Sequence, residues 1–147
     1  MIQRIQSLWF VLAAICGGLT FQFPFYGGTR MMGGDGTETS TGQQMVAAVM
    51  TSTFNIPIII FMSIAIVGAI HGLFSYYNRK HQFVVTLISM ISAIVALVLL
   101  FMATSKFESG GIRIEALLYF AVPVFLFLAA KGVRKDQNLI KSMDRLR

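Results

Sequence analysis

The side chains best suited to catalysis lie far apart in this sequence. Cys16 is a candidate nucleophile, His71 a candidate base, and Glu108 and Glu115 are candidate acids. Nucleophilic catalysis needs a thiol or hydroxyl beside a base, and a zinc site needs three or four ligands gathered together. The spacing assembles neither set, and the chain has no glycine-rich loop of the phosphate-binding type. We therefore predict no catalytic, cofactor-binding or metal-binding residue, and a protein that is not an enzyme.

His71 is the most notable of these residues because it falls inside an apolar stretch. A membrane-embedded histidine can relay protons or bind a metal. No carboxylate, cysteine or second histidine stands near it in the sequence, so we predict a lone histidine that is hydrogen bonded to a neighbouring helix. His81 is predicted to be solvated in a loop.

Four apolar stretches must position these residues, at 7–26, 54–76, 83–104 and 114–131. Each is long enough for a hydrocarbon core that a helix of about 20 residues crosses. None holds an Asp, Glu, Lys or Arg deep inside it. With 56% hydrophobic and 12% charged residues, the chain is also too apolar for a water-soluble domain. We predict an all-α membrane protein: one domain over residues 1–147, folded as a four-helix transmembrane bundle.

The element boundaries follow from the polar and glycine-rich segments. Helix two is extended back to residue 45, because Met45 to Phe54 is compatible with a helix and Asn55-Ile56-Pro57 marks a kink or a start. A flexible, solvated outer loop is predicted at 27–44, with a short hairpin as the weaker alternative. The predicted segments are helices at 7–26, 45–76, 83–104 and 114–131, outer loops at 27–44 and 105–113, an inner turn at 77–82 and a tail at 132–147.

The basic residues predict the orientation of this bundle. With both termini in the cytoplasm, nine of the twelve basic residues lie inside and three lie outside, which follows the positive-inside rule. The inner nine are Arg4, Arg79, Lys80, Lys131, Arg134, Lys135, Lys141, Arg145 and Arg147. The outer three are Arg30, Lys106 and Arg113. We therefore predict an N-in, C-in protein of the bacterial inner membrane.

Small residues predict where the helices pack. Gly17 and Gly18 each follow an alanine by four residues, and Gly68 precedes Gly72 by the same interval. Such small-xxx-small pairs let helices approach closely. The turn between helices two and three is very short, so these helices are predicted to be antiparallel neighbours. Glu115 opens helix four, where it is expected to pair with Arg113 or Lys106.

The tail is richer than membrane insertion requires. An apolar face is formed by Leu139, Ile140, Met143 and Leu146, and basic residues occupy the rest: Arg134, Lys135, Lys141, Arg145 and Arg147. The tail is predicted to be a cytoplasmic amphipathic helix that lies on anionic lipid or docks a protein partner. Arg79 and Lys80 of the inner turn are predicted to contact lipid phosphates. Nucleic acid is a weaker alternative, because no aromatic platform accompanies the charges.

Three segments carry a resemblance to a known family: Met1 to Gln6, the turn Asn78 to Gln82, and the ending Val133 to Asp136 with Leu139 to Arg147. Over its whole length the chain resembles domain of unknown function 4293, a family of four-helix bacterial inner-membrane proteins. The resemblance implies this architecture and no assigned activity. Gln137 departs from the family pattern, which has a carboxylate there.

Two functions remain as hypotheses. The first is a non-enzymatic accessory subunit or adaptor of a larger membrane-associated complex, suggested by the tail and the small-residue helix faces. The second is a small oligomeric transporter or channel, suggested by a stripe of small and polar residues, among them Thr86, Ser89 and Ser92, on helix three. A transporter usually needs a membrane-embedded charge, which this chain lacks. The adaptor is therefore the preferred hypothesis.

Overall fold

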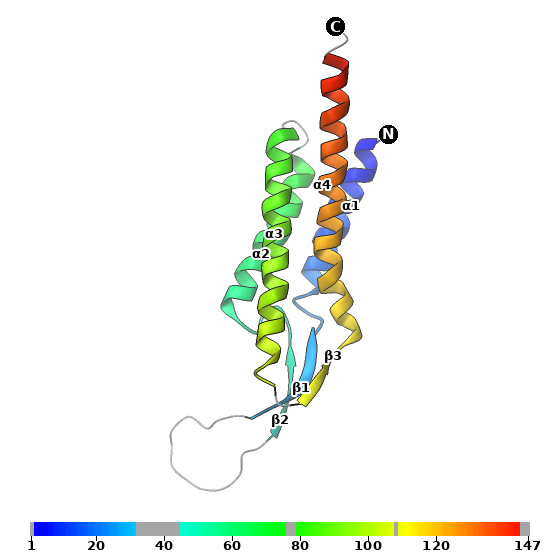
Figure 1. Ribbon diagram of the computed structural model, residues 1–147. Coiled ribbons are helices and arrows are strands. Elements are labelled where there is room, and N and C mark those ends of the chain that lie inside the picture. The colour runs from blue at the N-terminus through cyan, green and yellow to red at the C-terminus, as the bar shows by residue number, and fades with distance from the viewer. Residues whose placement is uncertain (1, 32–44, 76–78, 108, 145–147) are drawn as a thin grey trace.

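The computed structural model describes the backbone of residues 2–31, 45–75, 79–107 and 109–144, and the side chains of residues 6–29, 47–75, 79–107 and 109–139. Four helices run side by side: α1 (Ile2–Leu19), α2 (Ile56–Phe74), α3 (Arg79–Thr104) and α4 (Leu117–Asp144). α1 and α3 each pack against both α2 and α4, so the helices form a ring. The start of α1 and the end of α4 lie at one end of the bundle, here called the terminal end (Figure 1).

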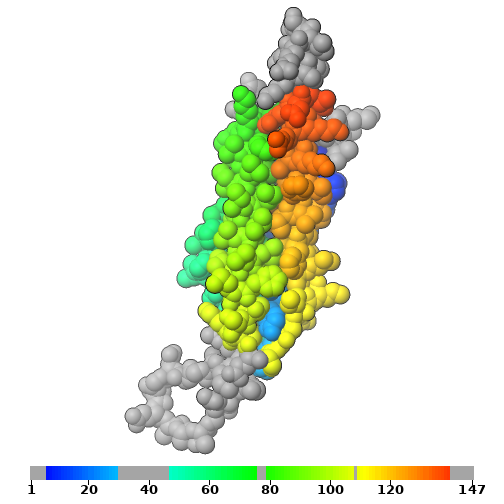
Figure 2. All heavy atoms as spheres, viewed as in Figure 1, coloured from blue at the N-terminus to red at the C-terminus, as the bar shows by residue number. Residues whose placement is uncertain are grey.

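The helices have the length and surface of membrane spans. α2, α3 and the segment Ile114–Leu139 are each long and apolar enough to cross a membrane, and a shorter apolar helix, Gln6–Leu19, lies within α1. Large apolar side chains such as Val67, Ile91 and Phe127 are exposed on the outside of the bundle. Figure 2 shows α3 and α4 in contact along one face of the molecule. The chain is therefore a mostly helical, multi-pass membrane protein.

A small sheet lies at the opposite end of the bundle, here called the sheet end. It contains β1 (Tyr26–Met31), β2 (Met45–Met50) and β3 (Ser109–Ile112) in the order β2-β1-β3. Both pairings are antiparallel, and Tyr26 lies opposite Met50 on one side and Ile112 on the other. The prediction of an all-α protein is therefore wrong at this end.

Close approach of glycine residues explains why β1 and β3 can pair. A Cβ on Gly28 would collide with the backbone carbonyl of Ser109, and a Cβ on Gly110 would lie 2.6 Å from the Gly28 Cα. We had interpreted these glycines as loop residues. Segments 27–31 and 109–112 are strands, so the outer-loop predictions at 27–44 and 105–113 are wrong there. Residues 32–44, including most of the alternative hairpin, lie outside the described part of the chain.

The predicted start of helix two at residue 45 is also wrong. Met45 to Met50 form β2, because their backbone groups pair with β1. α2 begins at Ile56, with Asn55 as its N-cap residue and Pro57 in its first turn. Proline is favoured there because a helix start has no partner for that N–H. The Asn55-Ile56-Pro57 signal thus marks a helix start.

Helix one ends earlier than predicted. α1 stops at Leu19, whereas the sequence favoured a helix to residue 26. The Thr20 hydroxyl donates a hydrogen bond to the Gly17 carbonyl at 2.6 Å, and Pro24 has no N–H to continue the helix. Phe25 then donates its N–H to the Met50 carbonyl at 2.7 Å and enters the sheet region. The predicted helix thus splits into α1 and an extended segment.

Candidate functional site

The terminal end holds an ion pair between the start of α3 and the last part of α4. Nη1 of Arg79 lies 3.0 Å from Oδ2 of Asp136. The Asp136 side chain is only 10% exposed and that of Arg79 30%, so water screens this pair less than a surface pair. We predicted that Arg79 contacts lipid phosphate, but in the structure Asp136 is its ionic partner.

Gln137 adds a second link at the same place. Its Nε2 donates a hydrogen bond of 2.7 Å to the backbone carbonyl of Arg79. An ionised carboxylate has no proton to donate, so a glutamate at position 137 could not make this bond. Asp136 and Gln137 are adjacent in α4 and both hold Arg79. We call these three residues the α3–α4 clamp.

Other buried polar contacts close this end of the bundle. Gln82 in α3 donates a hydrogen bond of 2.7 Å to the Gly72 carbonyl of α2. Gln6 of α1 is buried, and its side chain lies within 3.5 Å of the Cβ position of Gly132 in α4. Gln82 therefore links α2 to α3, while α1 packs on α4 through Gln6.

α4 continues past this clamp as one helix. It ends at Asp144, whereas we predicted one helix to 131 and a separate amphipathic helix over 132–147. The sequence has no proline between residues 131 and 144, and Gly132 packs near Gln6. The helix is therefore not interrupted between the two predicted parts. In Figure 1 the last turns of α4 extend beyond α1 and α3. We call residues 138–144 the α4 extension.

The predicted tail contacts are only partly described. Arg134, Lys135 and Leu139 are exposed, as is Lys80 at the start of α3. The remaining predicted contact residues lie outside the described side chains: Ile140, Lys141, Met143, Arg145, Leu146 and Arg147. The terminal end therefore presents a basic surface on α3 and α4.

His71 and His81 meet across the α2–α3 pair. Their ring centroids are 5.5 Å apart with the rings at 77°, and both residues are exposed. His71 also contacts Ser75, with 3.2 Å between Nδ1 and Oγ. We had predicted a lone His71 and a loop position for His81, and both interpretations are wrong. The signal that could have revealed the pair was the spacing of ten residues across the short connection between two predicted antiparallel helices.

The histidine pair borders a groove of about 460 Å³ between α2 and α3. Its walls are almost entirely apolar, with Ile64, Val67 and Gly68 on one side and Val85, Ile88 and Ser89 on the other. Among the described residues, no group of three or more His, Cys, Asp or Glu side chains could hold a metal ion. The groove is thus a mainly apolar surface with the two imidazoles on its lining.

Three of the four predicted packing glycines lie at close helix contacts. A Cβ on Gly17 would be 2.7 Å from Ile66 Cγ1, one on Gly72 would be 2.6 Å from Phe10 Cε1, and one on Gly68 would collide with the Ser89 hydroxyl. Gly18 differs, because nothing lies within 4 Å of its Cβ position. The close contacts join α1 and α3 to α2, whereas Gly18 is exposed.

The small and polar residues of α3 face into the bundle. Thr86 and Ser89 donate to carbonyls one turn back, at 2.7 and 2.8 Å, and the Ser92 hydroxyl bonds to the Phe61 carbonyl of α2. No buried side-chain polar atom among the described residues lacks a hydrogen-bond partner. This stripe is used for helix packing, which gives no support to its interpretation as a water-lined path.

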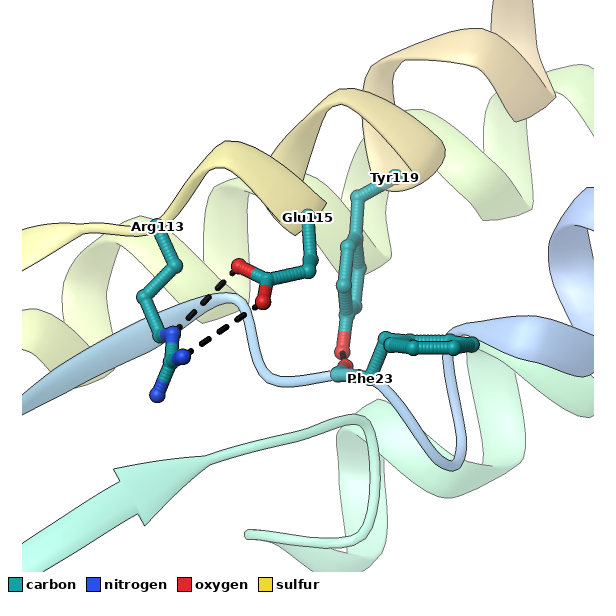
Figure 3. A network of polar contacts seen from close by, with 4 residues as sticks. All are labelled: Phe23, Arg113, Glu115 and Tyr119. Atoms are coloured by element: carbon teal, nitrogen blue, oxygen red, sulfur yellow. Dashed lines mark hydrogen bonds and ion pairs between the residues drawn. The ribbon is translucent and has the colours of Figure 1, made fainter.

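A polar cluster at the sheet end holds the non-helical segment after α1. The buried Tyr119 hydroxyl of α4 lies 2.6 Å from the Thr20 carbonyl and 2.7 Å from the Phe23 carbonyl, and its single proton can be donated to either. Figure 3 shows Tyr119 directed toward Phe23. Irregular backbone at membrane depth needs such partners. Figure 3 also shows the pairing of Arg113 with Glu115, at 3.3 Å between Nε and Oε2, which confirms one of the two predicted partners.

Comparison with known proteins places the chain in a family. A family model described as "Domain of unknown function (DUF4293)" matches residues 2–146, which is essentially the whole chain. The chain belongs to this family. The resemblance drawn from the two basic segments and the start of the chain is confirmed. No curated protein and no solved structure matches the chain.

Proposed function

We propose that this protein is a non-enzymatic adaptor or accessory subunit of a larger complex in the bacterial inner membrane. The observation that carries the proposal is the α4 extension, a continuation of a membrane helix past the rest of the bundle. In the proposed orientation both termini are cytoplasmic, and the extension reaches a protein partner at the membrane surface. Its sequence places Leu139, Ile140 and Met143 on one helical face, which suits a helix-in-groove contact.

The α3–α4 clamp supports this proposal because it fixes the base of the extension. Arg79 is held by both Asp136 and Gln137, immediately before the extension leaves the bundle. A helix that is held at its base loses less conformational freedom on binding, and this pre-organisation strengthens the complex. The exposed basic residues Lys80, Arg134 and Lys135 would at the same time attract anionic lipid to this end.

The test is affinity purification of tagged protein in mild detergent with three altered chains. One chain ends at Asn138. A second changes Leu139, Ile140, Met143 and Leu146 to serine, and its matched control changes Ser142 and Asp144 to alanine. We expect a stoichiometric partner that is lost from the first two chains and retained by the control, while all chains remain in the membrane.

Two outcomes would contradict the adaptor. Full-length protein that purifies without any stoichiometric partner would remove the basis for it. A partner that binds the chain ending at Asn138 as well as the full-length protein would show that the extension is not the docking element. The first outcome would lead to flux measurements in reconstituted vesicles, with empty vesicles as the reference.

A further inference from the structure

We propose that the groove between α2 and α3 binds one anionic phospholipid, with an acyl chain along its walls and the phosphate against His71 and His81. This site is separate from the α4 extension, so the inference goes beyond the proposed adaptor function. Three observations carry it: the apolar groove, the histidine pair beside it, and the charges around that pair.

The walls of the groove suit an acyl chain. They lie on the two apolar helices α2 and α3, both of which are long enough to cross a membrane, and the groove is open to the outside of the bundle. Gly68 and Ser89 lie in close contact on the lining of the groove, because a Cβ on Gly68 would collide with the Ser89 hydroxyl. The Ser89 hydroxyl donates to the Val85 carbonyl at 2.8 Å, so this polar group is already satisfied. Hydrocarbon rather than a polar ligand fits such walls.

The histidine pair lies toward the terminal end of the same groove. α2 runs toward the terminal end and α3 starts there, so His71 and His81 are about one turn from the helix ends. In a helix that just crosses a bilayer, the last turn lies where the lipid headgroups meet the acyl chains. An imidazole carries at least one N–H in either protonation state, so the two rings together present donors for phosphate oxygens. A phosphate accepts such bonds from both helices at once.

The charges around the pair favour an anion. α2 and α3 contain no Asp or Glu between Ile56 and Phe74 or between Arg79 and Thr104. Lys80 is exposed beside His81, and it is in neither of the two ion pairs of the described residues. Asp136 of α4, which packs on α3, is neutralised by Arg79 at 3.0 Å. The headgroup end of the groove is thus basic, while the remainder is apolar.

Native mass spectrometry of the purified, delipidated full-length protein tests this proposal. Phosphatidylglycerol and phosphatidylcholine with identical acyl chains are the two probes. We expect one phosphatidylglycerol to bind with about fivefold or greater preference, the size expected for a basic contact near the membrane surface. Equal binding of the two lipids by the wild-type protein would overturn the proposal.

Substitutions separate the two parts of the site. His71→Ala with His81→Ala is expected to abolish the preference for phosphatidylglycerol while both lipids still bind. Val67→Trp and Ile88→Trp, one on each wall, are expected to weaken the binding of both lipids. Val124→Trp is the matched control, because Val124 is 54% exposed on α4 and Val67 64% exposed on α2. Wild-type lipid binding by both wall variants, or an undiminished preference in the double histidine variant, would refute the assignment.

Discussion

Nη1 of Arg79 lies 3.0 Å from Oδ2 of Asp136, so a residue at the first turn of α3 fixes the part of α4 from which the extension leaves the bundle. Arg79 and Asp136 are 57 positions apart in the sequence, yet their side chains form one ion pair in space. The same contact removes Arg79 from the set of free cations at the terminal end.

Asp136→Ala should lower the free energy of unfolding by about 1–2 kcal/mol, because it leaves the partly buried Arg79 without its carboxylate. Thermal unfolding of purified protein in detergent measures the change. The matched control is Lys135→Ala, which alters an exposed neighbour in the same helix and should have little effect. Restoration of stability by Arg79→Asp combined with Asp136→Arg would identify the ion pair as the cause. An unchanged transition for Asp136→Ala would contradict the clamp.

Gly68→Leu should separate α2 from α3, because any Cβ at this position collides with the Ser89 side chain. Overpacking of this kind costs about 1–3 kcal/mol. Gly18→Leu is the control, since nothing lies within 4 Å of its Cβ position, and it should change stability by less than about 0.5 kcal/mol. Both values come from chemical denaturation in the same detergent. Equal effects of the two substitutions would show that Gly68 is not at a tight contact.

Tyr119→Phe should destabilise the protein by about 1–3 kcal/mol, because the buried Thr20 carbonyl and the partly buried Phe23 carbonyl lose the one hydroxyl proton that they share. The ring and its edge contact with Phe25, at 5.2 Å between centroids, remain in this variant. Tyr26→Phe removes a hydroxyl from a half-buried tyrosine of β1 and serves as the control. The two melting temperatures give the comparison, and no loss for Tyr119→Phe would exclude a stabilising role for this hydroxyl.

Cysteine labelling tests the proposed orientation. In a Cys16→Ser background, Lys106→Cys places a thiol at the sheet end and Lys135→Cys places one at the terminal end, and both positions are exposed. A membrane-impermeant maleimide should label Lys106→Cys in intact spheroplasts, and Lys135→Cys only after the membrane is opened. The reverse pattern would show that the termini lie outside. Labelling of both in intact spheroplasts would contradict a bundle that spans the membrane.

Local sequence was sufficient for several features of the fold. Hydropathy identified the apolar segments, Asn55-Ile56-Pro57 contained the signal for the start of α2, and Glu115 was correctly expected to pair with a nearby cation. These features depend on neighbours within a few residues or on transfer of a segment from water to lipid. The family resemblance was also visible in the sequence, and the family model matches residues 2–146.

Features that depend on distant partners were not predictable in this way. The apolar pattern of α1 continues through Phe21, Phe23 and Phe25, yet the helix ends at Leu19. The segment after Leu19 is held by Tyr119, which lies 99 positions from Thr20 in the sequence. The glycine-rich strands have no strong strand propensity, and their pairing across the sheet decides their conformation.

Hydropathy alone predicts a multi-pass membrane protein, because burial of apolar segments in lipid depends on their composition and length. The packing of the helices was needed to show that α4 continues to Asp144, that Arg79 is paired with Asp136, and that His71 meets His81 beside a groove. These arrangements depend on which helix faces come together, and lipid solvates every apolar face alike, so hydropathy carries no information about the choice.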